Sequence, residues 1–163
     1  MDRVEDGKFV DFNEPRFFTL IGGSSAGAYM RTALDRRLHY GYPVTGLGDA
    51  SQGAHKIKAY YRVPLDATSV KAAPLASPGN GGVLFIGPWF HSWFHPYSSG
   101  KLPPPDYQVG GHAIWARGWN DSLGVRLHNS WGPTWGLSGD CFLPYAYLAR
   151  VWEIWRTIDT DLV

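Results

Sequence analysis

The sequence predicts an α+β fold whose helical content lies early in the chain and whose antiparallel sheet or barrel lies late. One stretch near the N-terminus places apolar residues at helical spacing, whereas the second half holds short alternating or β-branched runs between turn residues. The 20 glycines and 12 prolines imply many turns and argue against an all-helical bundle. With 163 residues, 44% of them hydrophobic, the chain fits a single domain over residues 1–163 that can bury its own core.

Residues 1–50 contain the predicted helical part. Residues 1–23 are expected to be irregular or extended, with one short strand over 9–12. Ser24 or Ser25 is expected to cap a helix from about residue 26 to residue 39, because the apolar residues of this stretch fall on one face. Gly41, followed by Pro43, is expected to end that helix.

Residues 51–163 supply the sheet. Residues 56–63 alternate, with Ile57, Ala59, Tyr61 and Val63 expected on the buried face of a strand. Asp66 is expected to cap a short helix that ends at Ala73, before Pro74. Residues 82–86 predict a buried strand, and residues 87–110, dense in proline and aromatics, predict a long loop. The remaining predictions are strands over 112–119, 124–129, 141–143 and 151–158, a turn over 120–122 and a helical turn over 144–149.

Charge and composition exclude several classes of function. Fifteen Lys and Arg against 14 Asp and Glu leave a net charge of +1, so we expect no nucleic acid and no membrane partner. No apolar run approaches the roughly 20 residues that cross a bilayer, and the first residues contain no apolar signal region. We therefore expect a soluble protein without a signal peptide. The single cysteine excludes an internal disulfide and a multi-cysteine metal site.

Two motifs carry chemical information. Residues 110–114 read Gly-Gly-His-Ala-Ile, and residues 129–136 read Asn-Ser-Trp-Gly-Pro-Thr-Trp-Gly, followed by Gly139. They resemble the His and Asn motifs of papain-like cysteine peptidases, and residues 33–43 and 69–83 resemble weaker features of that family. The resemblance implies a papain-like fold in which residues 51–163 largely retain the antiparallel β-barrel half and residues 1–50 are a remnant of the helical half.

The same resemblance implies roles for three residues. In nucleophilic acyl transfer a thiolate attacks a carbonyl, a histidine shuttles the proton, and an asparagine orients the imidazole. His112 and Asn129 match the last two roles, and Trp131 matches the tryptophan that shields their hydrogen bond. We expect His112 and Asn129 on adjacent antiparallel strands within hydrogen-bond reach, with Trp131 over them.

The nucleophile departs from the family pattern. The catalytic cysteine lies about 130–150 residues before the histidine in such enzymes, whereas 111 residues precede His112 here. We therefore expect that segment to be absent from its usual place. Cys141 follows the histidine and is expected to be a small buried hydrophobe. Ser25 is an alternative nucleophile, although it lies nearer to His112 than the family spacing requires.

These observations favour a non-catalytic papain-like domain in which His112 and Asn129 are a relic pair. Such a domain acts by binding, as a structural subunit of a larger assembly such as a virus or phage particle. The aromatic residues Trp89, Phe90, Trp93 and Phe94 are expected to contact its protein partner. The alternative is a hydrolase that uses Ser25 or a nucleophile from a partner chain. No cofactor is expected.

Three other histidines have no predicted catalytic role. His91 and His95 are four residues apart, as in helical metal sites, but prolines bracket them and no carboxylate lies nearby in the sequence, so we expect no metal. His128 is expected to be solvated beside Arg126.

Overall fold

The computed structural model describes residues 3–5, 8–10, 13–25, 27–46, 56–73 and 82–159. The chain divides into two compact units. Unit 1 holds Met1–Tyr60 together with Ile158–Val163, and unit 2 holds Tyr61–Thr157. The boundary expected after residue 50, between the helical remnant and the barrel half, lies inside unit 1. The strand Ile57–Val63 begins in unit 1 and ends in unit 2.

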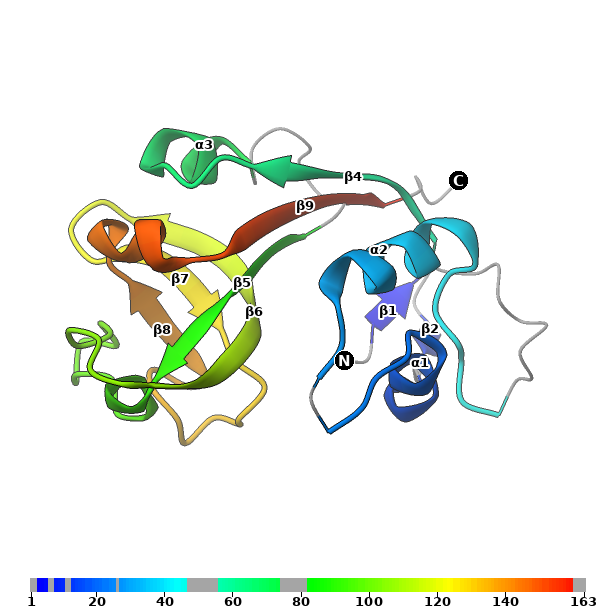
Figure 1. Cartoon of the computed structure of the whole chain (residues 1–163), viewed down its shortest axis with the longest axis horizontal. Helices are drawn as coiled ribbons and strands as arrows, with labels where there is room; N and C mark the ends of the chain where they lie inside the picture. Colours follow the sequence, from blue (N-terminus) through cyan, green and yellow to red (C-terminus); the bar gives the residue numbers. More distant parts are fainter. Residues whose placement is uncertain are drawn as a thin grey trace. The chain divides into compact units, whose positions relative to one another are not determined.

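Unit 1 opens with a hairpin and a short helix (Figure 1). Strand β1 (Arg3–Glu5) pairs antiparallel with β2 (Lys8–Val10). The predicted strand over 9–12 matches β2 only in part, since residues 11 and 12 lie outside the described residues. Helix α1 (Glu14–Leu20) was not predicted. It begins where the Asn13 side chain accepts a hydrogen bond from the Arg16 amide at 3.0 Å and where a proline occupies the first turn.

Helix α2 (Met30–His39) begins later than the sequence analysis predicted. Gly27 adopts a φ of +101°, and two backbone hydrogen bonds join it to Ser24, so the chain makes a tight turn at the expected helix start. The N-cap is Tyr29, with no side-chain hydrogen bond, and the prediction that Ser24 or Ser25 caps the helix was therefore wrong. Ala33 and Leu34 of α2 are buried.

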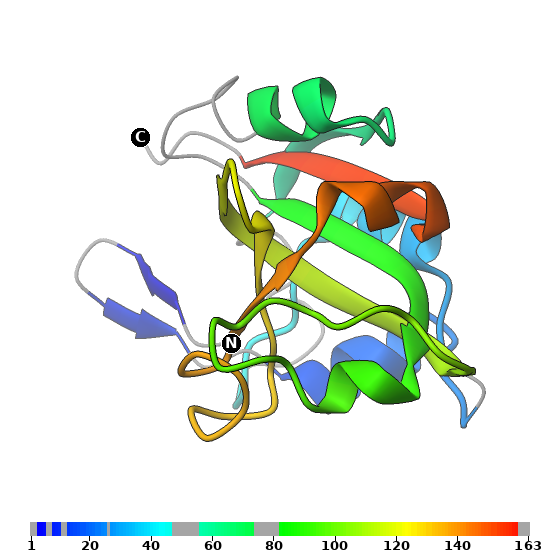
Figure 2. The same cartoon turned by 90° about the vertical axis from the view of Figure 1, so that its left-hand side faces the viewer.

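One antiparallel sheet organises the rest of the chain (Figure 1). Its strand order is β4-β9-β5-β6-β7-β8. Figure 2 shows β9, β5 and β6 side by side, and their registers pair Phe85 with both Ile154 and Ile114. The bounds are β4 (Ile57–Val63), β5 (Val83–Phe90), β6 (Gln108–Asn120), β7 (Gly124–His128), β8 (Asp140–Leu143) and β9 (Glu153–Asp159).

The predicted strands are confirmed, with differences at their ends. The turn between β6 and β7 forms because Asn120 Oδ1 accepts from the amides of Ser122 and Leu123, each at 2.9 Å. The burial predicted for β4 is incomplete. Ile57 and Val63 are buried, but Tyr61 is exposed. The neighbouring residue Tyr60 instead donates its hydroxyl to Asp35 on α2.

Among the described residues of unit 2, three short helices accompany the sheet. Helix α3 (Ala67–Ala72) is capped by Asp66, whose carboxylate accepts from the Ser69 amide at 2.9 Å, as predicted. A 3-10 helix, η2 (His91–Phe94), follows β5, and a second, η3 (Tyr145–Arg150), precedes β9 and matches the predicted helical turn. Pro74, expected to end α3, lies outside the described residues.

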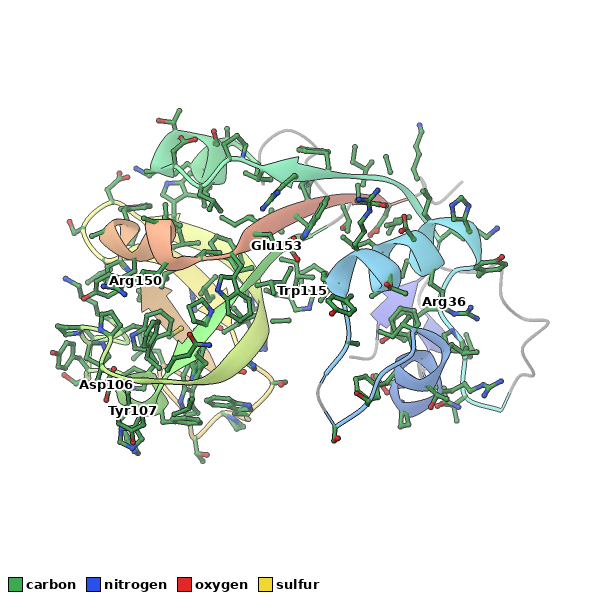
Figure 3. All side chains as sticks on the ribbon, in the orientation of Figure 1. Arg36, Asp106, Tyr107, Trp115, Arg150 and Glu153 are labelled. Carbon is green, nitrogen blue, oxygen red and sulfur yellow. The ribbon has the colours of Figure 1, made fainter. Side chains whose placement is uncertain are left out.

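The segment expected as a long loop is more ordered than predicted. Strand β5 continues to Phe90, with Pro88 opposite Gly111 in the ladder, and η2 follows at once. The prolines do not keep η2 extended. They fold back over it, since the carbonyl of Pro103 accepts from the Trp93 indole and that of Pro104 accepts from Ser92 Oγ, each at 3.0 Å. Figure 3 labels Asp106 and Tyr107 on this returning loop.

Three of the four aromatic residues that were expected to contact a partner are buried in this arrangement. Trp89, Phe90 and Trp93 join the core of unit 2, and only Phe94 of the four is exposed. Trp89, Phe90 and Trp93 are thus covered by unit 2 itself, which leaves Phe94 as the one of the four that is open to the expected contact with a protein partner. The other members of that core are Val63, Val70, Ala73, Val83, Phe85, Leu102, Ile114, Val125, Leu127, Cys141, Leu143, Leu148, Val151 and Ile154.

Candidate active site

The sheet brings His112 and Asn129 together from neighbouring strands. His112 lies in the middle of β6, and Asn129 directly follows β7, which pairs antiparallel with β6. The Asn129 amide donates to the Gly139 carbonyl at 2.8 Å, which fixes the backbone where β7 ends. His112 Nε2 lies 3.1 Å from Asn129 Oδ1. The predicted geometry of this pair is confirmed.

A second hydrogen bond decides which nitrogen of His112 carries the proton. The backbone amide of Ser130 donates to Asn129 Oδ1 at 2.9 Å, so this atom is an acceptor. His112 must then donate through Nε2–H, because a neutral imidazole has one donor and one acceptor nitrogen. Nδ1 is left as the basic nitrogen, and among the described residues it has no hydrogen-bond partner.

Indole rings enclose the His112–Asn129 pair. The Trp131 ring centroid lies 5.1 Å from that of His112, and the Trp89 centroid lies 4.7 Å from it, inclined at 67°. The predicted cover by Trp131 is confirmed, whereas Trp89 is an addition. Phe94 stacks on Trp131 at 5.1 Å, and Trp135 meets Trp131 edge-on at 5.3 Å. Asn129 itself is only 3% exposed, so its hydrogen bond to His112 is protected from water.

Enclosure also sets the charge of His112. Burial lowers the pKa of His112 below its ordinary value of 6.5, and the hydrogen bond to Asn129 opposes that change only in part. The imidazole is therefore neutral near pH 7. A neutral ring with an available Nδ1 is the form that accepts a proton from a nucleophile.

Cys141 does not provide that nucleophile. It lies on β8 with an exposed fraction of 0%, and burial raises the pKa of its thiol to about 12. A thiol in this environment is neither ionised nor accessible at neutral pH. The prediction of a small buried hydrophobe is confirmed.

Ser25, the alternative nucleophile, is exposed beside the Ser24–Gly27 turn of unit 1, whereas His112 belongs to unit 2. Its proposed role stays a prediction.

A second histidine, His128, was expected in solvent and is instead part of an ion cluster. Its Nδ1 lies 2.6 Å from Oδ1 of Asp140, a buried carboxylate on β8. Arg126 Nε donates to the other carboxylate oxygen at 2.7 Å, and Arg117 Nη1 lies 3.6 Å from Oδ1. Burial raises the pKa of Asp140, but the hydrogen bonds from His128 and Arg126 outweigh it and the net pKa lies below the ordinary value. The outward alternation of β7 was right for Arg126, yet β8 brings Asp140 beneath both side chains.

His91 also has a carboxylate neighbour that its flanking sequence did not reveal. Asp106 Oδ2 lies 3.3 Å from His91 Nδ1, and Asp106 Oδ1 accepts from the Ser92 amide at 2.9 Å. The returning proline segment places Asp106 there from 15 residues further along the chain. Within the described ranges, no three His, Cys, Asp or Glu side chains gather as a metal site would require.

Known structures with the same fold are papain-like cysteine proteases. The chain is similar to xylellain, a cysteine protease from Xylella fastidiosa, with a TM-score of 0.76 and 20% identity over 96% of this chain and 72% of that one. It is also similar to bromelain from Ananas comosus, solved with the inhibitor E64, with a TM-score of 0.66 and 14% identity over 95% of this chain and 81% of that one. The chain thus has the papain-like fold with a reduced helical half.

A sequence relative agrees with this fold. Forty-five residues, 27% of the chain, are 42% identical to an uncharacterised peptidase C1-like protein of Acanthamoeba polyphaga mimivirus, and they span only 14% of that protein. No family model matches the chain. None of the helices in the described residues has the length and apolar character needed to cross a membrane.

Proposed function

We propose that unit 2 is the histidine-bearing half of a papain-like acyl-transfer site, with a nucleophile supplied from outside this unit. The observation that carries the proposal is the His112–Asn129 pair, which leaves Nδ1 as a base in a neutral, enclosed ring. The fold shared with cysteine proteases supports the same chemistry.

The steps follow from the two nitrogens. The nucleophile attacks the carbonyl carbon of an acyl substrate while Nδ1 takes its proton, and Nε2–H donates to Asn129 throughout. The tetrahedral intermediate then collapses: the bond from the carbonyl carbon to the leaving group breaks, and the imidazolium gives its proton to the departing group. In the second half of the reaction water attacks the acyl carbon and loses a proton to Nδ1. The bond between the acyl carbon and the nucleophile then breaks, and the nucleophile regains that proton.

Two sources of nucleophile fit the proposal. One is a cysteine or serine of a partner chain placed against His112, and the other is Ser25 of unit 1. Cys141 is excluded by its burial and its raised pKa.

A second candidate is a non-catalytic structural subunit of a larger assembly, of which a virus or phage particle is one example. Two observations favour it. The single cysteine is unusable as a nucleophile, and the stacked rings of Phe94 and Trp131 are 38% and 37% exposed, so an apolar contact is available beside His112. The peptidase C1-like relative from a giant virus is consistent with a virion.

Active-site labelling separates the two candidates. The full chain, alone and in its native complex, is treated with an epoxide or vinyl-sulfone thiol probe and with a fluorophosphonate serine probe, and the labelled residue is read by mass spectrometry. The first candidate predicts labelling of Ser25 or of a partner residue, with loss of that labelling in a His112→Gln variant. A native complex in which neither probe labels any residue in a His112-dependent way contradicts acyl transfer and supports the structural subunit.

A further inference from the structure

Trp89 has a place in the site that its sequence context did not suggest. It lies on β5 opposite Gly110, two residues before His112 on the paired strand, and its indole meets the imidazole at 4.7 Å. Gly110 carries no side chain that would separate the rings. Trp89 is 5% exposed, whereas Trp131 is 37% exposed. The centroids of the two indole rings lie 5.3 Å apart. Of the two rings that contact His112, Trp131 is partly exposed to solvent and Trp89 is buried.

Neighbouring rings hold the Trp89 indole in place. Trp93 meets it edge-on at 5.4 Å, and the Trp93 indole nitrogen donates to the Pro103 carbonyl at 3.0 Å. A continuous set of contacts therefore runs from Pro103 through Trp93 and Trp89 to His112. A buried indole fixed in this way restricts the orientations open to the imidazole.

We propose that Trp89 is a positioning residue for His112, which holds the imidazole on Asn129 and excludes water from the ring that Trp131 leaves partly open. The inference rests on the proposed function only for its catalytic meaning, since the packing and its effects on the imidazole need no nucleophile. Trp89 acts through His112 and touches no substrate in this account.

The consequence is a measurable change in His112. Trp89 helps to bury the imidazole, and burial disfavours the charged form, in agreement with the lowered pKa of His112. Replacing Trp89 by a smaller side chain admits water and should move the pKa of His112 upward, toward 6.5. Arg150 of η3 is the charged side chain that lines the same small cavity as Trp89 and His112, so its contribution is measured separately.

The experiment is a pH titration of the histidine side chains in the ¹⁵N-labelled full chain by NMR, with His112 assigned from the signal lost in His112→Gln. Trp89→Leu and the milder Trp89→Phe are compared with Phe90→Leu. Phe90 is the matched control, because it is the next residue of β5, equally buried, and contacts Trp93 rather than His112. Arg150→Gln measures the guanidinium separately.

Trp89→Leu is expected to raise the pKa of His112 and to mix the two neutral tautomers, with Trp89→Phe showing the same change more weakly. Phe90→Leu should lower thermal stability while leaving both properties of His112 unchanged. The proposal is overturned if both Trp89 variants titrate as the wild type does, or if Phe90→Leu shifts His112 as far as Trp89→Leu. Because no turnover is measured, either result leaves the acyl-transfer proposal to its own labelling test.

Discussion

Two histidines on neighbouring strands of one sheet have opposite surroundings. His112 on β6 bonds to the amide of Asn129 among indole rings, whereas His128 on β7 lies against the Asp140 carboxylate with two arginines nearby. An amide orients an imidazole without adding charge, so His112 keeps a basic nitrogen. A carboxylate shared by three cationic or basic side chains instead joins β7 to β8. The nature of the partner, more than the position in the sheet, separates a histidine that keeps a basic nitrogen from one that is held in an ion cluster.

Loss of the Asp140 charge should have the largest effect on stability. Asp140→Asn is expected to lower the free energy of unfolding by about 2–3 kcal/mol, because Arg126 and His128 lose a buried charged acceptor and only part of that loss is regained from water. Urea unfolding followed by tryptophan fluorescence measures it. The control is Asp121→Asn, which removes an exposed ion pair with Lys71 and should have a much smaller effect on the free energy of unfolding. Equal effects for the two variants would show that the Asp140 cluster is not a structural centre.

Loss of the Asn129 side chain should lower stability less than loss of the Asp140 charge, but it should change the orientation of the His112 ring. Asn129→Ala removes the acceptor of both His112 Nε2 and the Ser130 amide, which should cost about 1–2 kcal/mol in the same urea assay. Asn120→Ala, which removes a turn acceptor far along β6, is the control. Only the Asn129 variant should alter the NMR signals of the His112 ring. An unaltered His112 ring in Asn129→Ala would contradict the orienting role.

Stability should fall in acid through both groups, at different pH. The pKa of His112 is lowered in the fold, so the unfolded chain binds its proton more readily, and this loss of stability begins as the pH falls through 6.5. The pKa of Asp140 is also lowered, and its contribution is complete above 3.8 and lost as the pH falls below that value. The free energy of unfolding measured from pH 8 to pH 3 should show both steps. His112→Gln should abolish the first, and a first step that persists would assign it to another group.

The Cys141 thiol should be almost unreactive toward thiol reagents in the folded chain. Its buried thiol, with a pKa of about 12, should not react with a thiol reagent such as Ellman's reagent in the folded chain at pH 8, and should react at once in denaturant. The measurement is the absorbance of the released thiolate. Rapid reaction in the folded chain would reopen Cys141 as a nucleophile.

The local patterns in the sequence predicted much of this fold. The alternation of apolar residues and the positions of turn residues predicted β4, β6, β7 and β8. The cap of α3 by Asp66 was predicted from the residues next to it in the sequence. Helix α1 was missed because Asn13 and a first-turn proline were not recognised as a helix start. The early start given to α2 was wrong because Gly27 takes a backbone conformation that composition does not show.

The candidate site likewise contains residues that the sequence predicted and residues that it did not. His112, Asn129 and Trp131 were found because their motif preserves residue types at fixed spacing. Trp89, Asp140 and Asp106 were missed because their contacts join residues 12 to 23 positions apart through strand pairing and a returning loop. One signal was available for Trp89. If residues 82–90 are paired with 108–116 as a hairpin, a tryptophan falls opposite the glycine pair before His112.

The protonation state of His112 tests the central claim most directly. A long-range ¹H–¹⁵N NMR spectrum of the wild-type full chain at pH 7.5 distinguishes the two neutral tautomers of each histidine. We expect His112 to carry its proton on Nε2, with Nδ1 unprotonated, in a single fixed form. A proton on Nδ1, or rapid averaging between the two nitrogens, would contradict an imidazole oriented by Asn129 to act as a base.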